Sequence, residues 1–309
     1  MKYSFVVIAY NEETAIESCI GSIVDQKGIG SSYEIIVVDD GSRDKTAEIV
    51  TKCSKKNSKV KLISYNVNCG RGYARNEGIL ESTGEFIAMV DADISLPTHW
   101  LEYCLKNITG YDAVGGVATP DGDVSYVHSL FKLSPKLTPH TTTVSGGNGL
   151  YRRDVFKETN FDQKLREGED VDFNHQLEAK GLNSKTIPNL LVHHQETKSF
   201  VKSIKWLFES GIGATRQLIR YRRIRTPDIA YFGFVLVVLS SLIIAMLLKQ
   251  WFMLSLIFVY PLITSLLHIR SRFYYSTSRK SGYLGAVVTN YFLIISYYLG
   301  RSVGWKTLV

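Results

Sequence analysis

Two acidic residues, Asp91 and Asp93, follow directly on the apolar run Phe86–Val90, which is typical of a buried strand. Side chains alternate between the faces of a strand, but where it ends the chain can turn and bring both carboxylates to one point. Adjacent carboxylates repel each other unless a cation lies between them. Oxygen ligands of this kind suit Mg²⁺ or Mn²⁺, and such an ion also binds substrate phosphates. The pattern therefore predicts a divalent metal site, and the alternative is a solvated turn.

A second acidic pair, Asp39 and Asp40, ends another largely apolar run, Tyr33–Val38. Asp40 could accept a hydrogen bond from a base or a ribose, and Gly41 would let the backbone approach closely. The same residues also make a good turn before a helix. The sequence holds no GxxxxGK[ST], and no GxGxxG follows the first strand, so neither of these phosphate loops is expected to hold a nucleotide.

A third acidic pair, Glu169 and Asp170, opens a helical pattern, a place where acidic residues are also common for electrostatic reasons. His193 and His194 end an apolar stretch, where single histidines are more often structural than ligands. Gly147 and Asn148 lie among small residues that would let the backbone approach a sugar or a diphosphate; a flexible hinge is the alternative.

The elements that must position these residues alternate between strand and helix patterns, which predicts an α/β fold with a parallel sheet covered on both faces. Helical spacing follows the first three of the expected strands, and Asn11 is expected to cap the first helix. Ligands of such sheets bind beyond the carboxyl ends of the strands, where all four acidic residues of the first two pairs fall. The expected strands are Tyr3–Ala9, Tyr33–Val38, Val60–Ser64 and Phe86–Val90.

Six short motifs now occur in a fixed order along the chain. They are Ala9-Tyr10-Asn11-Glu12, Val37-Val38-Asp39-Asp40-Gly41-Ser42-x-Asp44, Gly72-x-x-Arg75-Asn76-x-Gly78, Asp91-Ala92-Asp93, Gly146-Gly147-Asn148 and Glu169-Asp170. The ordered set resembles the family 2 glycosyltransferases, from about Tyr3 to Phe200. The resemblance implies the GT-A fold, a Rossmann-like and mostly parallel sheet flanked by helices. It also implies inverting sugar transfer from a UDP- or GDP-linked donor with Mg²⁺ or Mn²⁺. One departure is Ala9, where the family commonly has proline.

The resemblance also implies roles for single residues. Asp170 would be the base that deprotonates the acceptor hydroxyl, and Glu169 would orient the acceptor or the loop. The metal ligands would be Asp91, Asp93 and His194, the last preferred over His193. The residues implied to contact the donor or its nucleotide are Ala9, Tyr10, Glu12, Val38, Asp40, Arg75, Asp91, Ala92, Gly147 and Asn148.

The charge of this 309-residue chain is unevenly spread, with a formal net charge of +7. A basic cluster lies just before a long apolar region, which favours an anionic membrane surface and no nucleic acid as partner. The cluster comprises Lys198, Lys202, Lys205, Arg216, Arg220, Arg222, Arg223 and Arg225. The four cysteines form no CxxC pair and are expected to be reduced thiols of a cytosolic domain.

The sequence therefore predicts three parts: a GT-A domain at 1–198, a basic amphipathic interfacial helix with a linker at 199–228, and a transmembrane region at 229–309. Apolar runs at about 230–248, 251–267 and 283–299 are the expected spans. Basic residues before the first run and after the second predict a multi-pass protein with a cytoplasmic catalytic domain. Arg301 and Lys306 fit poorly with a third full span, and a re-entrant third run or a soluble helical core are alternatives.

The expected function is sugar transfer to a lipid-linked or other membrane glycan acceptor. Three alternatives stay open. A polyprenyl-phosphate sugar synthase shares the first motifs and a membrane tail. A processive polysaccharide synthase is suggested by Gln217-Leu218-Ile219-Arg220-Tyr221, which resembles a QxxRW signature with tyrosine in place of tryptophan. A non-catalytic nucleotide-sugar-binding membrane protein is the third.

Overall fold

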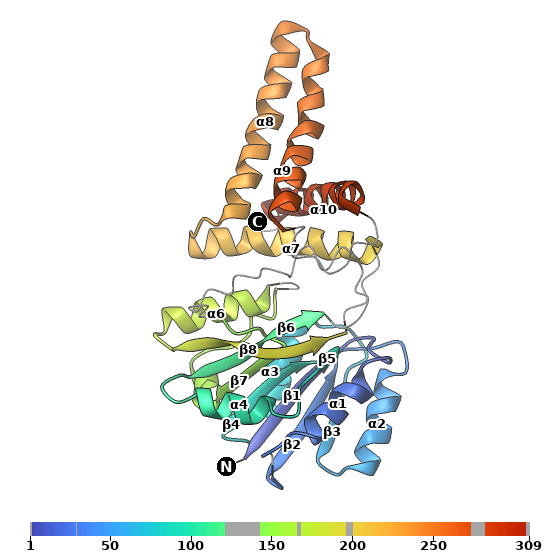
Figure 1. The fold of residues 1–309 in the computed structure, drawn as a ribbon, viewed down its shortest axis with the longest axis vertical. Coiled ribbons are helices and arrows are strands. Elements are labelled where there is room, and N and C mark those ends of the chain that lie inside the picture. The colour runs from blue at the N-terminus through green and yellow to red at the C-terminus, as the bar shows by residue number, and fades with distance from the viewer. Residues whose placement is uncertain are drawn as a thin grey trace. The chain divides into compact units, whose positions relative to one another are not determined.

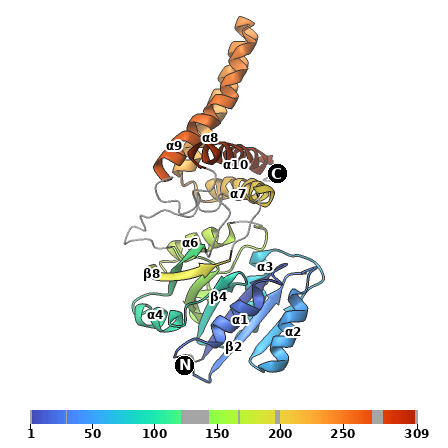
Figure 2. The ribbon, with the colours of Figure 1, turned by 45° about the vertical axis from the view of Figure 1, so that its right-hand side comes forward.

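The computed structural model describes residues 2–28, 30–120, 143–165, 168–195, 200–272 and 282–306. These residues divide into two compact units: an N-terminal unit that ends at residue 195, and a C-terminal unit that begins at Phe200 (Figures 1 and 2). The domain boundary expected between residues 198 and 199 lies outside the described residues.

The N-terminal unit is built on one mixed sheet with the strand order β3-β2-β1-β4-β7-β6-β8-β5. The neighbours β3, β2, β1 and β4 pair in parallel, as the alternating sequence pattern predicts, whereas β7 runs antiparallel to both β4 and β6. The parallel half therefore brings the ends of β2 and β4 to one edge. The strands are β1 Tyr3–Ala9, β2 Tyr33–Asp39, β3 Val60–Ser64, β4 Phe86–Asp91, β5 Ile94–Ser95, β6 Ala113–Pro120, β7 Asn148–Arg152 and β8 Ser184–His194.

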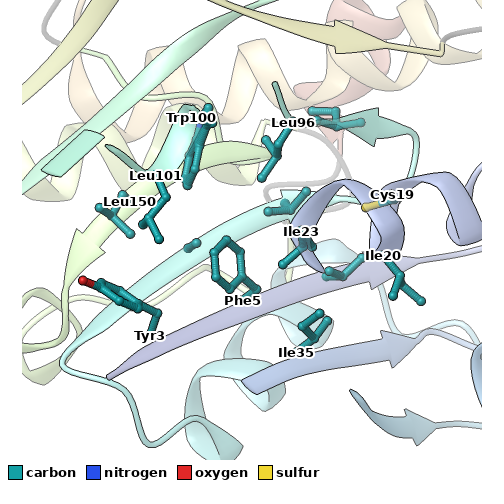
Figure 3. Packing of buried hydrophobic residues seen from close by; sticks show 14 of the residues in the cluster. Tyr3, Phe5, Cys19, Ile20, Ile23, Ile35, Leu96, Trp100, Leu101 and Leu150 are labelled. Atoms are coloured by element: carbon teal, nitrogen blue, oxygen red, sulfur yellow. The ribbon is translucent and has the colours of Figure 1, made fainter. Parts of the chain in front are cut away.

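Helices flank this sheet, and alternate residues of β1 face opposite layers (Figure 1). Phe5 packs with Ile20, Ile23 and Trp100 of the layer that holds α1 and α4 (Figure 3). Ile8 faces the other way and packs with Ala74 of α3. Burial of both faces explains why the central strands are largely apolar. The helices are α1 Ile16–Val24, α2 Thr46–Lys56, α3 Arg71–Glu81, α4 Trp100–Asn107, the 3₁₀ helix η1 Arg153–Lys157 and α6 Glu169–Ala179.

Asn11 is not a helix cap, contrary to the expectation from the sequence. Helix α1 begins at Ile16, and Asn11 adopts a left-handed backbone conformation with φ 57°. Its side-chain oxygen accepts a hydrogen bond from the Arg43 backbone N–H at 2.8 Å. Asn11 therefore ties the end of β1 to the loop after β2, because asparagine tolerates this conformation and offers an acceptor.

Glu34 is a buried carboxylate inside β2. Its Oε1 accepts hydrogen bonds from Ser4 Oγ at 2.7 Å and from the Thr83 backbone N–H at 2.7 Å. Its Oε2 accepts a charge-assisted bond from Lys61 Nζ at 3.0 Å. Burial is the largest single influence on Glu34 and raises its pKa. The hydrogen-bond donors together outweigh burial and lower the pKa to about 2.

The C-terminal unit is helical, with α7 Phe200–Tyr221, α8 Thr226–Leu248, the 3₁₀ turn η2 Trp251–Ser255, α9 Leu256–Arg272 and α10 Gly282–Gly304. Among the described residues two helical segments, Thr226–Leu248 and Trp251–His268, are long and apolar enough to cross a membrane. They form a hairpin, within which Tyr260 donates a hydrogen bond to the Ala230 carbonyl at 2.9 Å. Only 17% and 11% of the residues in the apolar windows of these two segments are buried inside the protein, so neither is the core helix of this unit.

Candidate active site

The acidic residues identified in the sequence lie where the strands end. Asp91 is the last residue of β4, and Asp93 precedes the short strand β5. Strand β5 pairs antiparallel with β8, which places Ile94 opposite His194. The Asp93 carboxylate and the imidazole of His194 therefore meet, with Oδ2 and Nε2 2.9 Å apart. His193 is exposed, so His194 is the histidine that the sheet brings to this edge.

The chemistry of this pair fits a divalent cation. Carboxylate oxygen is a ligand for Mg²⁺ and Mn²⁺, and an imidazole nitrogen is a further donor. Asp93 and His194 are already within hydrogen-bonding distance, so an ion could contact both side chains with little rearrangement. Within the described residues no group of three or more histidine, cysteine, aspartate or glutamate side chains is arranged to hold a metal ion.

Arg75 is the centre of the other half of the site. Its guanidinium is buried, with Nη2 2.8 Å from Asp91 Oδ1 and Nε 3.5 Å from Glu169 Oε1. Nη1 donates to the Gly146 carbonyl. One side chain of α3 thus connects the end of β4, the glycine loop and the first turn of α6. Removal of the positive charge would leave the two carboxylates without the cation that pairs them in a poorly solvated place.

Two glycines allow the loop to lie against these acidic side chains. A Cβ on Gly147 would collide with the Asp91 carboxylate, and one on Gly146 would lie 2.8 Å from the Asp170 Cβ. The Asp91 backbone N–H also donates to the Gly147 carbonyl at 3.1 Å. The glycine loop therefore brings Asp91 and Asp170 into one site, because only residues without a side chain fit between them.

The buried charges shift the pKa values of this cluster. Burial raises the pKa of Asp91, but the charges of Arg75, Arg71 and His194 outweigh it and hold that pKa below its ordinary value. Burial is also the largest influence on Glu169, followed by the charge of Asp170. Together they raise the pKa of Glu169 to about 7, although Arg75 opposes them. Asp91 is therefore anionic, whereas Glu169 changes its charge near neutral pH.

Glu12 is close enough to Asp91 and Asp93 for their negative charges to affect it. Burial first, and then the charges of Asp93, Asp91 and Asp44, raise the pKa of Glu12 to about 8. Its backbone N–H donates to Thr46 Oγ1 at 2.8 Å, which holds the turn after β1 against α2. The end of β1 thus contributes a third acidic side chain to the region around Asp91 and Asp93, and a cation would relieve their mutual repulsion.

Asp170 is half-buried in the first turn of α6, directly after Glu169. Its Oδ1 accepts the Val171 backbone N–H at 2.8 Å. Gly168 precedes the helix with φ 82°, a left-handed conformation that glycine adopts easily. The free N–H groups and the dipole of a helix N-terminus stabilise a carboxylate at this position.

Asp40 holds the loop that leads into α3. Its two oxygens accept the backbone N–H groups of Cys69 at 2.7 Å and Gly70 at 2.8 Å, and the side chain is buried. A carboxylate has further lone pairs, so these bonds do not by themselves prevent contact with a ligand. Tyr10, by contrast, is exposed at the same edge of the sheet and can reach a ligand freely.

Four other predicted contact residues are buried. Ala9, Val38 and Ala92 pack in the core, so only their backbone can face a ligand. Asn148 is fully buried, and its side-chain oxygen accepts a hydrogen bond from the Trp100 indole at 2.7 Å. These buried residues support the site and do not expose their side chains to a ligand.

Arg71 is a site residue that sequence reasoning missed. It is the exposed first residue of α3, one helical turn before Arg75, and its charge lowers the pKa values of Glu12, Asp91 and Glu169. The signal was present in the sequence, because residues four apart on a helix share a face. An arginine at this position can bind an anionic group such as a phosphate.

Comparison with known proteins supplies the family. The family model described as "Glycosyl transferase family 2" matches residues 4–159. "Glycosyltransferase AglE" of Haloferax volcanii is 30% identical over 222 residues, which cover 68% of this chain and 72% of that protein. A second relative, from Methanococcus voltae, is 26% identical over 277 residues, or 82% of this chain and 85% of the relative. It is a dolichyl N-acetyl-alpha-D-glucosaminyl phosphate 3-beta-D-2,3-diacetamido-2,3-dideoxy-beta-D-glucuronosyltransferase.

A solved structure shares the architecture. The mannosyltransferase PcManGT from Pyrobaculum calidifontis, solved with GDP-Man and Mn²⁺, superimposes with a TM-score of 0.62. The match covers 97% of this chain and 87% of that one at 17% sequence identity, a level that speaks for the fold alone. The GT-A fold expected from the sequence is confirmed.

Proposed function

Because this chain belongs to the family 2 glycosyltransferases, we propose that it transfers a sugar from a nucleotide-diphosphate sugar to the hydroxyl of a membrane-held, polyprenyl-linked acceptor, with inversion at the anomeric carbon. The donor is UDP- or GDP-linked. A divalent ion, Mg²⁺ or Mn²⁺, binds near Asp91, Asp93 and His194, and Asp170 is the base. In this assignment the N-terminal unit is the catalytic domain.

The observation that carries the proposal is the ion-paired chain from Asp91 through Arg75 to Glu169. It connects the end of β4, where the donor is expected, with the first turn of α6, where Asp170 lies. Inverting transfer needs a base on the side of the sugar opposite the leaving diphosphate. Acidic groups on two separate elements of one site can bind the donor on one side of the sugar and deprotonate the acceptor on the other.

Each side chain then has a defined task. The acceptor oxygen forms a bond to the anomeric carbon, the bond from that carbon to the donor phosphate breaks, and the acceptor proton passes to Asp170. Arg71 faces the negative charge that develops on the diphosphate. Arg75, which the resemblance assigns to the donor, is buried and holds Asp91 and Glu169 in place. The divalent ion, when bound, supplies further stabilisation of the departing phosphate charge.

The acidic acceptor side favours a neutral hydroxyl over a phosphate acceptor. Glu169 and Asp170 stand together there, and the Arg75 guanidinium beside them already pairs with Asp91 and Glu169. A phosphate monoester carries about two negative charges near pH 7 and would be repelled. It would also need no base. A polyprenyl-phosphate sugar synthase is therefore the second candidate, and the acceptor chemistry separates the two.

The apolar hairpin α8–α9 supports attachment to a membrane. The basic residues that flank the hairpin favour a cytoplasmic location of the catalytic domain. Attachment confines the enzyme and a lipid acceptor to one surface and so raises their effective concentration. A processive synthase would need a wider set of spans than the two segments found among the described residues.

The test is to incubate membranes that contain the full chain with a panel of labelled UDP- and GDP-sugars, with and without Mn²⁺, and then to extract the lipid. Label in an oligosaccharide linked to lipid supports the proposal. Label in an acid-labile, phosphate-linked monosaccharide supports the synthase instead, and a long polymer supports a processive enzyme. Donor binding with neither transfer nor hydrolysis in any metal would identify a non-catalytic binder.

Asp170→Asn tests the base. Its transfer rate should fall at least about a hundredfold, since general base catalysis contributes roughly that much, while donor binding stays unchanged. Asp154→Asn is the matched control, because Asp154 is an exposed carboxylate on η1 paired with Lys157. Near-normal turnover of Asp170→Asn would refute the base assignment, and a loss in both variants would point to misfolding.

A further inference from the structure

The exposed face of α10 is largely apolar, and Ser302 near the end of the helix is the exposed polar residue on it among the described residues. Leu284, Val288, Phe292, Leu299 and Val303 are all exposed. At 3.6 residues per turn, these five positions fall within about 100° of the helix circumference. An apolar stripe of this width on a surface helix is a face that packs against something.

Buried polar groups of α10 bind other helices of the C-terminal unit. Asn290 donates to Ser265 of α9 at 3.2 Å, and Ser296 donates to the Ile204 carbonyl of α7 at 2.7 Å. Arg301 is fully buried and pairs with the buried Asp228 of α8 at 2.5 Å. These polar side chains therefore contact protein, although Asn290 Oδ1 and Arg301 Nε and Nη2 make no hydrogen bond there, and the apolar side is left for an environment other than water.

The backbones of α10 and α7 are in direct contact. A Cβ on Gly300 would collide with the Phe208 carbonyl, and one on Gly211 would collide with the Tyr297 carbonyl. Leu207 and Leu293 pack together beside these glycines. Within this unit, both views show α7 and α10 side by side across the base of the α8–α9 hairpin, which extends away from them (Figures 1 and 2).

We propose that α10 does not cross the bilayer but lies in its interfacial plane beside α7, with the stripe from Leu284 to Val303 buried among lipid acyl chains. The expected third span at 283–299 is then a second in-plane helix. The α8–α9 hairpin is the part of the described chain that crosses the membrane. The inference rests on the membrane attachment through that hairpin, which belongs to the proposed function.

Lipid is the occupant that best fits the surroundings of the stripe. The neighbouring hairpin exposes large apolar side chains, among them Leu236, Leu239 and Leu247. Exposed basic residues lie on α7 and the turn after it, such as Lys205 and Arg222, and cations of this kind favour lipid phosphates. An in-plane helix buries its apolar side by roughly 5–10 Å and keeps its charges near the headgroups.

Sidedness is the first test. With α10 in the plane, Lys306 lies on the same side of the membrane as the N-terminal unit. The exposed native Cys69 marks that unit, whereas Cys19 and Cys104 are buried. The variant Lys306→Cys is combined with Cys53→Ser, and a second version also carries Cys69→Ser. Both proteins are placed in oriented vesicles and treated with a membrane-impermeant maleimide. Labelling of residue 306 and Cys69 from the same side supports the proposal, and labelling from opposite sides overturns it.

Depth is the second test. Spin labels at Leu284→Cys, Phe292→Cys and Val303→Cys, in the full chain in phospholipid vesicles, should report nearly equal depth. A spanning helix would spread the first and last by about 28 Å, since a helix rises 1.5 Å per residue. Leu239→Cys on α8 is the control and should report a deep position.

The possible outcomes separate the two proposals. Graded depths along α10 with a deep Leu239 label overturn the in-plane helix alone. A Leu239 label in water overturns the membrane hairpin as well. A third outcome is that labels on the stripe are shielded from both oxygen and water-soluble relaxers and show spin–spin broadening between chains. This result would show that a second copy of this chain covers the stripe, and it would also overturn the proposal.

Discussion

At the scale of single residues, Arg75 determines whether the acidic site can exist. It is a buried cation between Asp91 and Glu169, and an arginine suits this place because its planar fork reaches several acceptors at once. The Gly146 carbonyl completes its set of partners. The site is therefore held together by one buried positive charge.

Arg75→Met should destabilise the protein by about 3–5 kcal/mol, because the change leaves buried carboxylates unpaired. The free energy of unfolding in detergent measures the effect. Arg43→Met is the matched control, since Arg43 is exposed, and its change should stay within about 0.5 kcal/mol. Equal stability of the two variants would mean that the ion-paired chain contributes nothing.

Glu169 should make sugar transfer sensitive to pH near neutrality. Its pKa is raised to about 7, so the residue is neutral below that pH and anionic above it. An anionic Glu169 adds negative charge beside Asp170, the proposed base, and this charge favours removal of the acceptor proton. We therefore expect kcat to fall as the pH decreases through about 7 in the native protein.

Glu169→Gln should remove this step and hold kcat at the low-pH level throughout. Glu178→Gln, an exposed change on the same helix, should keep the step. A step that persists in Glu169→Gln would assign the titration to another group. The measurement is kcat against pH for all three proteins under saturating donor and acceptor.

At the scale of elements, Glu34 shows how a polar residue inside a strand can fix the neighbouring strands. It ties β2 to Ser4 of β1 and to the turn at Thr83. Its pKa is lowered from 4.5 to about 2, so its stabilisation is present above pH 4.5 and is lost as the pH falls through about 2.

Glu34→Gln should cost about 1–3 kcal/mol near pH 7, the usual range for hydrogen bonds to a charged group. The difference from the native protein should shrink between pH 4.5 and 2, because the native carboxylate is protonated there. Urea unfolding at several pH values measures it. Glu48→Gln on the exposed side of α2 is the control, and a difference that does not vary with pH would contradict the assignment.

The elements that were predictable from the sequence depend on short-range patterns. The first four strands follow from apolar runs, and their carboxyl ends from the parallel alternation, so Asp40 and Asp91 could be located at one edge. The hydrogen bonds of Asn11 and of Asn148 with Trp100 depend on partners far away in the chain. No local spacing encodes such partners, and for the same reason the buried role of Arg75 was not foreseen.

At the scale of the whole molecule, the C-terminal unit is organised by a buried ion pair. Asp228 of α8 accepts from the Arg225 backbone N–H at 2.6 Å and pairs with Arg301 of α10. Arg301 also lies 5.1 Å from the ring of Tyr231, a cation–π distance. These contacts fix the start of the apolar hairpin to the last turn of α10.

Asp228→Asn and Arg301→Met should each lower the stability of the full chain in detergent by about 3–5 kcal/mol, because each leaves an opposite charge buried without its partner. The double variant should cost less than the sum of the two. A double-mutant cycle on the free energy of unfolding measures the coupling, and additive effects would show that the two charges do not depend on each other.

The contact between Asp93 and His194 has a consequence for biosynthesis. The two residues are 101 positions apart, and they meet only when β5 pairs with β8 at the last edge of the sheet. A nascent chain that has folded its first four strands still lacks half of this pair. If the proposed ion needs both side chains, we therefore expect it to bind only after the sheet is complete.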